Sequence, residues 1–383
     1  MIEPGATIGI LGGGQLGRMT GLAARSLGYD VHVLDPDPNC PASVIASRTI
    51  GARFDDAAAA ASLAERCAVV TLEIEQIGRD AMAAVAERTP LRPSASAVHV
   101  IQDRIRQKTW LHANGFPVGA FRTVGSREES VAAFESLGRC IFKSTHGGYD
   151  GRGQVRVASA DEAANAWAAL GEKPCLVEQF IDIEREISVL VARRPRATGA
   201  TSEPQCVFFP PAYNHHEHGI LDWSIFPAVL SAEVVRRAET LAGGIATTLG
   251  IEGLIAVEMF IERSGQLLVN ELAPRPHNTF HASERACTTS QFEQLVRAVC
   301  DLPLGSTEIL RPSAIANLLG DLWSDGTPRY AAALEVPSVR LHLYGKASAR
   351  PGRKMGHLSA VGTSGEEAMA RVLRARAALR HTP

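Results

Sequence analysis

The chain has 383 residues, a net charge of −2 and 45% hydrophobic residues, a length suited to two or three domains. A nearly neutral chain gives no electrostatic indication of binding to nucleic acid or a membrane surface, and no apolar run is long enough to span a bilayer. The seven cysteines are scattered without a CxxC pair, and the N-terminus lacks a signal-peptide pattern, so we expect a cytoplasmic protein with reduced thiols.

Strands and helices alternate in the first segment, residues 1–97. We expect strands at Thr7–Leu11, Val31–Leu34 and Val69–Leu72, with a helix at Arg18–Leu27 after the first of them. This order predicts a Rossmann-like parallel sheet with right-handed crossovers.

Two features lie where ligands of such sheets bind, at the carboxyl ends of the strands. Residues 12–17 read G-G-G-Q-L-G, the dinucleotide-type glycine spacing, and Asp35 stands near the expected acidic position. The pattern alone leaves NAD and another phosphorylated or polar ligand both open. Glu73 and Glu75 follow the third strand, either as ligand contacts or as a polar strand end.

Prolines and serines at Pro90–Ser96 predict a domain boundary, followed by one helix over about Val98–Ala113. This helix carries Arg104 among several basic residues, which alone are typical of a solvated helix face. Gly115 and Pro117 end it.

A strand from Cys140 delivers Lys143 into a loop with four glycines, and a second strand follows at Gln154–Val157. Strand, loop and strand form a hairpin, unlike the strand-to-helix turn of a P-loop. Such a flap can fold over a polyphosphate and donate backbone N–H groups, with Lys143 as a point charge on phosphate. The alternative is a plain hairpin, which the charged residues crowded into the loop make less favourable.

The next strand ends in Leu176–Ile181, an apolar run with an acid and an amide that is typical of the linker beside an adenine pocket. Glu186 lies in an apolar strand and is expected to have a partner there. Residues 213–219 contain three histidines; without a second ligand cluster we expect polar loop contacts near the nucleotide in preference to zinc.

The stretch 256–278 predicts a hairpin with Glu258 in its first strand and Glu271 near the end of its second. Paired across an antiparallel ladder, the two carboxylates would lie side by side and could hold Mg²⁺, with Asn270 as a neighbouring oxygen. The alternative is a solvated hairpin with surface glutamates. A polar and basic cluster between and after two prolines favours a site: Arg275, His277 and Asn278.

The last segment contains an expected strand at Val339–Tyr344, another starting near Gly356, and a helix at Glu366–Leu379. Between the strands, the basic turn R-P-G-R-K-M-G-H (350–357) is either a solvated turn or a phosphate nest, and its glycines and proline favour the nest.

Together these motifs resemble the ATP-grasp superfamily and, within it, the N5-carboxyaminoimidazole ribonucleotide synthetases of purine biosynthesis. The resemblance covers nearly the whole chain in family order, in these stretches: G-G-G-Q-L-G-R (12–18), D-R-I-R-Q-K (103–108), G-G-Y-D-G-R-G-Q (147–154), N-E-L-A-P-R-P-H-N (270–278), S-Q-F-E-Q (290–294) and R-P-G-R-K-M-G-H (350–357). It implies an α/β and α+β fold: a pre-ATP-grasp domain at 1–97, an ATP-grasp domain at 98–311 whose lid is about 115–182, and a small mixed domain at 312–383.

The resemblance also implies a reaction. ATP would phosphorylate bicarbonate to carboxyphosphate, and the carboxyl group would pass to N5 of 5-aminoimidazole ribonucleotide, with Mg²⁺ (or Mn²⁺) as cofactor and a homodimer as the assembly. A formate-dependent glycinamide ribonucleotide transformylase is the alternative within the superfamily. A nicotinamide oxidoreductase is a remote one that would use only the N-terminal glycine turn.

The family's site residues carry over by motif. Nucleotide contacts would come from Arg104, Lys143, Gly148, Tyr149, Asp150, Gly151, Arg152, Gly153, Gln154, Glu178, Gln179, Phe180, Ile181, Glu186, His216, Asn270 and Glu271. Catalytic roles would fall to Asp150, Arg152, Arg275 and Asn278, with Asp150 taking the proton of the attacking amine. The ribonucleotide would be bound by Gln15, Leu16, Glu73, Lys346, Arg353 and Lys354, the last three at its 5′-phosphate. The metal would be bound by Glu258 and Glu271.

Three departures from the family bear on the substrate pocket. Thr71–Gln76 lacks the aromatic residue and asparagine that are common there, and the segment 193–205 is longer than expected. Phe280 stands where glycine is usual and is expected to crowd its loop.

Overall fold

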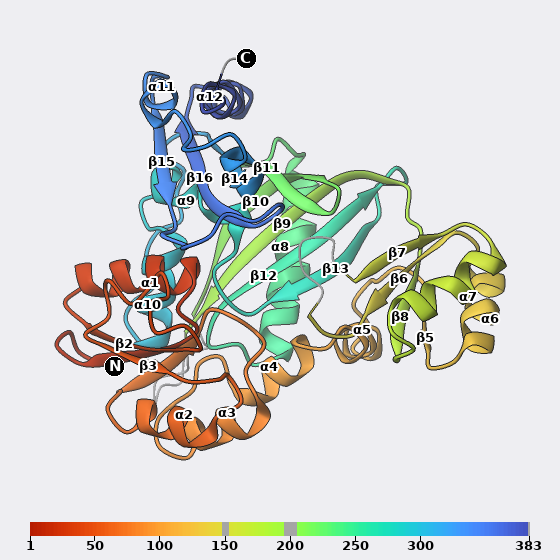
Figure 1. The fold of residues 1–383 in the computed structure, drawn as a ribbon, viewed down its shortest axis with the longest axis horizontal. Helices are drawn as coiled ribbons and strands as arrows, with labels where there is room; N and C mark the ends of the chain where they lie inside the picture. Colours follow the sequence, from red (N-terminus) through yellow and green to blue (C-terminus); the bar gives the residue numbers. More distant parts are fainter. Residues whose placement is uncertain (148–152, 195–204, 382–383) are drawn as a thin grey trace.

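The computed structural model describes residues 1–147, 153–194 and 205–381, and its strands form three sheets (Figure 1). The predictions made for Gly148–Arg152, and for most of the segment 193–205, lie outside the described residues. None of the helices within the described ranges is long and apolar enough to cross a membrane.

The N-terminal sheet is parallel and four-stranded, in the order β3-β2-β1-β4, which confirms the predicted Rossmann-like arrangement. Because β1 pairs with both β2 and β4, the glycine turn, Asp35 and Glu73 meet at one edge of the sheet. The elements of this segment are β1 (Thr7–Leu11), α1 (Gln15–Ser26), β2 (Asp30–Asp35), β3 (Arg48–Gly51), α2 (Ala57–Ala64), β4 (Val69–Leu72) and α3 (Arg79–Ala86).

The single helix predicted over Val98–Ala113 is wrong, because two helices stand there: α4 (Ala95–Ile101) and α5 (Arg104–Ala113). Asp103 separates them, since its Oδ1 accepts a hydrogen bond from the Arg106 backbone N–H at 2.8 Å and so caps α5. The cap places Arg104 in the first turn of α5.

The segment predicted as the lid, and called the lid below, contains a four-stranded antiparallel sheet in the order β5-β8-β6-β7, with two helices packed together beside it (Figure 1). The predicted hairpin around the glycine flap is confirmed, since Lys143 on β6 is paired with Gln154 on β7. The lid elements are β5 (Phe121–Val124), α6 (Arg127–Leu137), β6 (Cys140–Ser144), β7 (Gln154–Val157), α7 (Ala160–Ala169) and β8 (Cys175–Gln179).

The central sheet has eight strands in the order β13-β12-β9-β10-β11-β14-β16-β15. The strands after residue 312 join this sheet through the antiparallel pair β11–β14, so the C-terminal segment extends the central sheet. The strands are β9 (Ile183–Arg193), β10 (Cys206–Glu217), β11 (Ile220–Phe226), β12 (Gly253–Glu262), β13 (Leu267–Ala273), β14 (Ser313–Leu319), β15 (Val339–Leu343) and β16 (Lys354–Val361).

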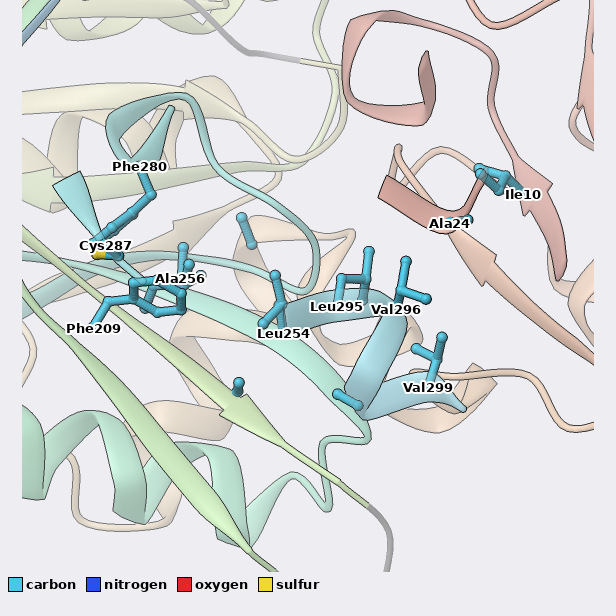
Figure 2. Close-up of a cluster of buried hydrophobic side chains, with 14 of the residues drawn as sticks. Ile10, Ala24, Phe209, Leu254, Ala256, Phe280, Cys287, Leu295, Val296 and Val299 are labelled. Carbon is cyan, nitrogen blue, oxygen red and sulfur yellow. The ribbon is translucent and has the colours of Figure 1, made fainter. Parts of the chain in front are cut away.

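Helices cover this sheet and link it to the N-terminal one. In Figure 2, Leu295, Val296 and Val299 of α10 lie between Leu254 of β12 and the N-terminal pair Ile10 and Ala24, in one continuous buried cluster. Shared burial of this kind fixes the glycine turn relative to the central sheet. The remaining helices are α8 (Ala232–Thr248), η1 (Asn278–Phe280), α9 (Ser283–Ala286), α10 (Gln291–Val299), η2 (Gly320–Trp323), α11 (Tyr330–Leu334) and α12 (Gly365–Ala378).

Candidate active site

The paired glutamates of the predicted hairpin lie directly opposite each other, Glu258 on β12 and Glu271 on β13. Opposed residues of an antiparallel ladder project from the same face, so the two carboxylates are neighbours as expected. Asn270 Nδ2 donates a long hydrogen bond of 3.4 Å to Glu258 Oε2, and His277 Nε2 lies 3.2 Å from Glu258 Oε1. The site is therefore rich in oxygen ligands.

The electrostatics of this pair suit a divalent cation. Burial raises the pKa of Glu258 to about 7; the negative charges of Glu271 and Glu186 add to the rise, and His216 opposes it. Burial also holds the pKa of His277 well below its usual value, so this neighbour is neutral and does not compensate the carboxylates. Glu271 has a cation, Arg104, only at 3.9 Å. Two adjacent carboxylates in this setting fit the donor set that Mg²⁺ takes from proteins.

A third carboxylate of the site, Glu178 on β8, has the opposite environment. Its oxygens contact two ammonium groups: Lys108 Nζ lies 2.6 Å away, and Lys143 Nζ is in direct contact. Burial alone would raise the pKa of Glu178, but the charges of Lys143 and Lys108 outweigh it and lower the pKa to about 2. Glu178 is therefore ionised and fully compensated by the protein.

Lys108 also connects the lid to the central sheet. Besides Glu178, its Nζ donates to the carbonyl oxygens of Val269 and Asn270 at 3.2 and 3.0 Å. A buried lysine that spans β8 and β13 fixes the lid strand beside the strand that carries Glu271.

Arg104 contributes positive charge on the same wall. Its Nη2 lies 3.9 Å from Glu271 Oε2, and its Nη1 donates to the Ser144 carbonyl at 3.1 Å. Arg104, Lys143, Glu178 and Glu271 line one small pocket together with Asn270. The pocket thus has the mixture of cations and carboxylates expected for a nucleotide phosphate with its metal.

The histidine-rich stretch lies mostly in strand β10, which corrects the predicted polar loop. His216 Nδ1 lies 2.5 Å from Glu186 Oε2 on the neighbouring strand β9, so the partner expected for Glu186 is present. Burial lowers the pKa of His216, but its contact with Glu186 and the charge of Glu258 raise it above the usual value. His215 is stacked on Trp223, and within the described ranges none of the three histidines belongs to a cluster of three metal-ligating groups.

The end of strand β8 is the segment predicted as a linker beside an adenine pocket. Phe180 is half-exposed, its backbone N–H donates to the Arg139 carbonyl, and the Arg139 guanidinium lies 4.7 Å from its ring centroid. Gln179 is exposed and Ile181 is partly exposed, which leaves this edge accessible to a ligand.

Arg275 and Asn278 continue from β13 towards the N-terminal sheet. Arg275 Nε lies 2.8 Å from Glu75 Oε1, so the second glutamate after β4 has a defined partner. Asn278 Oδ1 lies 3.0 Å from His281 Nε2. Phe280 does not crowd this loop as predicted: it is fully buried between Phe209 and Phe226, as Figure 2 shows for Phe209.

The glycine turn after β1 donates its backbone N–H groups to the protein's own carboxylates. Gly14 and Gly17 donate to the Glu73 carboxylate at 2.7 and 2.8 Å, and Gly13 donates to Asp35 Oδ2 at 2.8 Å. A dinucleotide pyrophosphate would need these donors. The turn is therefore built to hold Glu73 in place, and a β-carbon on Gly14 would come within 2.5 Å of a Glu73 oxygen.

Two further residues predicted to bind the ribonucleotide, Gln15 and Leu16, begin the helix that follows this turn. Leu16 is buried with Phe292 and Tyr344, so only its backbone is available to a ligand, whereas Gln15 is partly exposed. Arg18, one turn along α1, donates to the Tyr344 carbonyl at 3.1 Å and joins the turn to the C-terminal strands.

The basic C-terminal residues are close to one another in space. Lys346 Nζ donates to the Lys354 carbonyl at 2.7 Å, and Arg353 donates to the Ser348 carbonyl at 2.8 Å. Lys354 is buried, and its charge lowers the pKa of Glu258, which places the basic group within electrostatic range of the paired glutamates.

The predicted flap residues Gly148, Tyr149, Asp150, Gly151 and Arg152 lie outside the described part of the chain. Gly153 and Gln154, which follow them, are described, and Gly153 has a φ of +66°. A left-handed residue of this kind favours glycine at the point where the loop enters β7.

Comparison with known proteins gives close matches over the full length. An N5-carboxyaminoimidazole ribonucleotide synthase from Brucella melitensis biotype 1 is 41% identical over 94% of this chain and 97% of the relative. A crystal structure of an N5-carboxyaminoimidazole ribonucleotide synthetase in complex with ADP is 37% identical, with a TM-score of 0.90 over 98% of this chain and 97% of that chain. The Aspergillus clavatus synthase in complex with ADP and 5-aminoimidazole ribonucleotide is 31% identical, with a TM-score of 0.87 over 98% of both chains.

This chain belongs to the N5-carboxyaminoimidazole ribonucleotide synthase family. Three family models match successive parts of it: the ribonucleotide synthetase preATP-grasp domain at residues 5–102, the ATP-grasp domain at 109–292 and the phosphoribosylaminoimidazole carboxylase C-terminal domain at 313–371. The chain is accordingly an ATP-dependent ligase with the ATP-grasp fold, as the sequence motifs predicted.

Sequence reasoning missed two residues that line the candidate pocket. Lys108 compensates Glu178, and Gln107 Oε1 accepts the Leu272 backbone N–H at 3.1 Å and so holds β13. Both stand in the D-R-I-R-Q-K motif, but basic and amide residues on a helix are usually solvated. One signal could have indicated them: the D-R-I-R-Q-K motif is among the stretches that resemble the family, and it directly precedes the lid in the sequence.

Proposed function

We propose that this chain carboxylates 5-aminoimidazole ribonucleotide at N5, using ATP and bicarbonate and releasing ADP and phosphate in purine biosynthesis. The observation that carries the proposal is the register pairing of Glu258 with Glu271, which puts two carboxylates beside the cations of Arg104 and Lys143. A hard cation and the phosphates of ATP complete such a site. The relatives of known structure whose titles name ADP and 5-aminoimidazole ribonucleotide support the same substrates.

In this proposal the lid and the central sheet share the nucleotide. Lys143, Arg104 and the flap residues 148–154 hold the phosphates, and residues 178–181 with Glu186 and His216 hold the adenosine. The Glu178 carboxylate is already bound by two lysines, so its part is to keep Lys143 in place while the linker backbone meets the base.

Mg²⁺ would be held by Glu258 and Glu271, with Asn270 adjacent and Mn²⁺ as a substitute. When bound, it neutralises the charge of the transferring phosphoryl group. The two glutamates keep their oxygens on one face of the hairpin, and Lys143 approaches the phosphates from the lid.

Bicarbonate would lie near Arg275 and Asn278, at the end of β13. Its oxygen attacks the γ-phosphorus of ATP, ADP leaves, and carboxyphosphate forms. The N5 amine then attacks the carboxyl carbon, a C–N bond forms, phosphate departs and the amine loses a proton. Asp150 is the proposed acceptor of this proton, and Arg152 is proposed as a further catalytic residue. Anchoring of Arg275 by Glu75 keeps a cation next to these anions and helps to exclude water.

The ribonucleotide would span the edge of the N-terminal sheet. Glu73, Gln15 and the Leu16 backbone face its imidazole and ribose, and Lys346, Arg353 and Lys354 bind its 5′-phosphate. The contact of Arg18 with Tyr344 supports this arrangement, because it brings the glycine turn and the basic strand pair together.

The test is ADP release from the purified chain with Mg²⁺ and ATP. We expect release only when bicarbonate and 5-aminoimidazole ribonucleotide are both present. Release that depends on formate and glycinamide ribonucleotide would instead identify the transformylase, and a change in NADH absorbance would identify an oxidoreductase. Carboxylated product detected by mass spectrometry with ¹³C-bicarbonate completes the assignment.

We further propose a homodimer in the cytoplasm that acts on small molecules, without nucleic acid or membrane partners. The near-neutral charge of the chain supports the absence of nucleic-acid and membrane partners. Sedimentation of the purified chain tests whether it forms a homodimer.

A further inference from the structure

Three metal-ligating side chains meet away from the nucleotide site, at the junction of α9 with the last two strands of the central sheet. Glu284 lies on α9, His342 on β15 and His357 on β16, and the two histidines are paired in register. One donor atom from each residue lies within 4.8 Å of the other two. Helix α9 packs against β14 and β16, so the three residues come from separate segments that folding brings together (Figure 1).

Each of these residues has a buried polar atom that lacks a hydrogen-bond partner within the described ranges: Glu284 Oε2, His342 Nε2 and His357 Nε2. His357 is completely buried. An unsatisfied buried polar atom costs about 1–3 kcal/mol, and native structures rarely place three together without a further ligand. His342 Nδ1 lies 3.7 Å from Glu284 Oε2, too far for a hydrogen bond.

The histidines are prepared to act as neutral ligands. Burial lowers the pKa of His342 to about 4 and the pKa of His357 well below its usual value, so both imidazoles are uncharged at neutral pH. His357 Nδ1 lies 2.8 Å from the Tyr344 hydroxyl, a contact that fixes one ring nitrogen and leaves Nε2 for a ligand. His281 is stacked on the other face of His357, but contacts with Asn278 and Gln291 occupy both of its nitrogens.

We propose that Glu284, His342 and His357 form a binding site for one borderline divalent cation of the Zn²⁺ class. Two imidazoles and one carboxylate suit Zn²⁺ and its neighbours, whereas Mg²⁺ takes oxygen ligands. The rings of His342 and His357 are stacked 4.3 Å apart at 10°, so binding requires the His342 ring to turn towards the ion. This turn is available because β15 is the edge strand of the sheet and the last torsion of histidine is broad.

The bound ion would connect α9 to the strand pair that carries Lys354. Helix α9 follows Arg275 and Asn278 in the chain. The ion would therefore stabilise the junction between the segment that carries these two residues and the strands β15 and β16. The proposal is independent of the carboxylation reaction, because none of the three residues has a part in it.

The experiment uses the full chain, freed of metals with a chelator and then titrated with Zn²⁺ against a chromophoric indicator. Excess Mg²⁺ and ADP keep the paired glutamates occupied. We expect one equivalent of Zn²⁺ to bind, and His342→Gln and Glu284→Gln each to weaken this binding at least tenfold. His215→Gln, at an exposed histidine stacked on Trp223, is the matched control and should bind Zn²⁺ like the wild type.

Two further measurements distinguish binding at this site from zinc binding elsewhere on the protein. Co²⁺ should give the d–d absorption of an N,O-ligated ion without the near-ultraviolet band of a thiolate, which excludes the cysteines. Zn²⁺ should raise the melting temperature of the wild type and leave that of His342→Gln unchanged. Absence of a bound equivalent, or equal binding by wild type, His342→Gln and Glu284→Gln when circular dichroism shows all three folded, overturns the proposal.

Discussion

Glu178 is buried and Glu258 is half-buried in the candidate active site, yet the charges of these two carboxylates are balanced in opposite ways. Burial raises the pKa of each. At Glu178 two lysines reverse the effect and lower the pKa to about 2, whereas Glu258 faces a second carboxylate and its pKa rises to about 7. Burial sets how much positive charge a carboxylate needs nearby in order to stay ionised. The neighbouring residues determine whether the protein supplies this charge or a ligand must supply it. The protein's own lysines balance the Glu178 carboxylate, whereas Glu258 has another carboxylate directly opposite it.

The largest effect should come from removing one member of the Glu258–Glu271 pair. Glu271→Gln should lower the rate of ADP release about 10³-fold at saturating substrates, because a charged metal ligand is lost. The free energy of unfolding should not fall, because a repulsive neighbour of Glu258 is also lost. Steady-state kinetics and urea denaturation measure the two quantities. Glu262→Gln, on the same hairpin, is the control with an unchanged rate; an unchanged rate in Glu271→Gln would show that the metal assignment is wrong.

The compensated carboxylate should behave differently, with a pH-dependent effect on stability. The pKa of Glu178 falls from its ordinary 4.5 to about 2 on folding, so its contribution is present above about pH 4.5 and is lost as the pH falls towards 2. Glu178→Gln should therefore lower the free energy of unfolding by about 3 kcal/mol at pH 7. Urea denaturation between pH 7 and pH 3 should show the two proteins converging as the solution becomes acidic. A difference that is independent of pH contradicts the ion-pair account.

Removing only one of the two lysines should have a smaller effect. Lys108→Met should lower the free energy of unfolding by about 2 kcal/mol, because Glu178 keeps Lys143 while the contacts with two β13 carbonyls are lost. Lys173→Met, at an exposed lysine in the same part of the chain, should change it by less than about 0.5 kcal/mol. Equal values for the two variants would mean that Lys108 does not link lid and sheet.

The smallest effect is expected at Asn270. Its hydrogen bond to Glu258 is long, at 3.4 Å, so Asn270→Ala should lower the free energy of unfolding by only about 0.5–1 kcal/mol. The apparent affinity for Mg²⁺ should fall several-fold, because the amide next to Glu271 is lost, and titration of ADP release with Mg²⁺ measures this. A loss as large as that of Glu271→Gln would place Asn270 among the metal ligands.

Local pattern was sufficient where neighbours in sequence are also neighbours in space. The hairpins that pair Glu258 with Glu271 and Lys143 with Gln154 follow from alternation and turn residues alone. The prediction of one helix over Val98–Ala113 was wrong because the pattern of basic and apolar residues continues across Asp103. The side chain of Asp103 caps α5 and so starts a second helix there.

Contacts between distant segments were beyond such patterns. From the sequence, Lys108 is predicted to lie on an exposed helix face, but in the structure it contacts β8 and β13. Phe280 is predicted to crowd its loop, but in the structure it packs against Phe209 and Phe226 from two strands. The glycine turn was recognised, but not that its N–H groups are donated to Glu73 and Asp35.

The sequence by itself determined the parallel N-terminal sheet, the two hairpins and the family, because these depend on periodicity and on motifs a few residues long. Only the tertiary structure decided which buried charges are compensated and how Glu284, His342 and His357 come together. The reason is physical: pKa values and ligand sets depend on distances of a few ångströms between groups that the chain separates by tens to hundreds of residues.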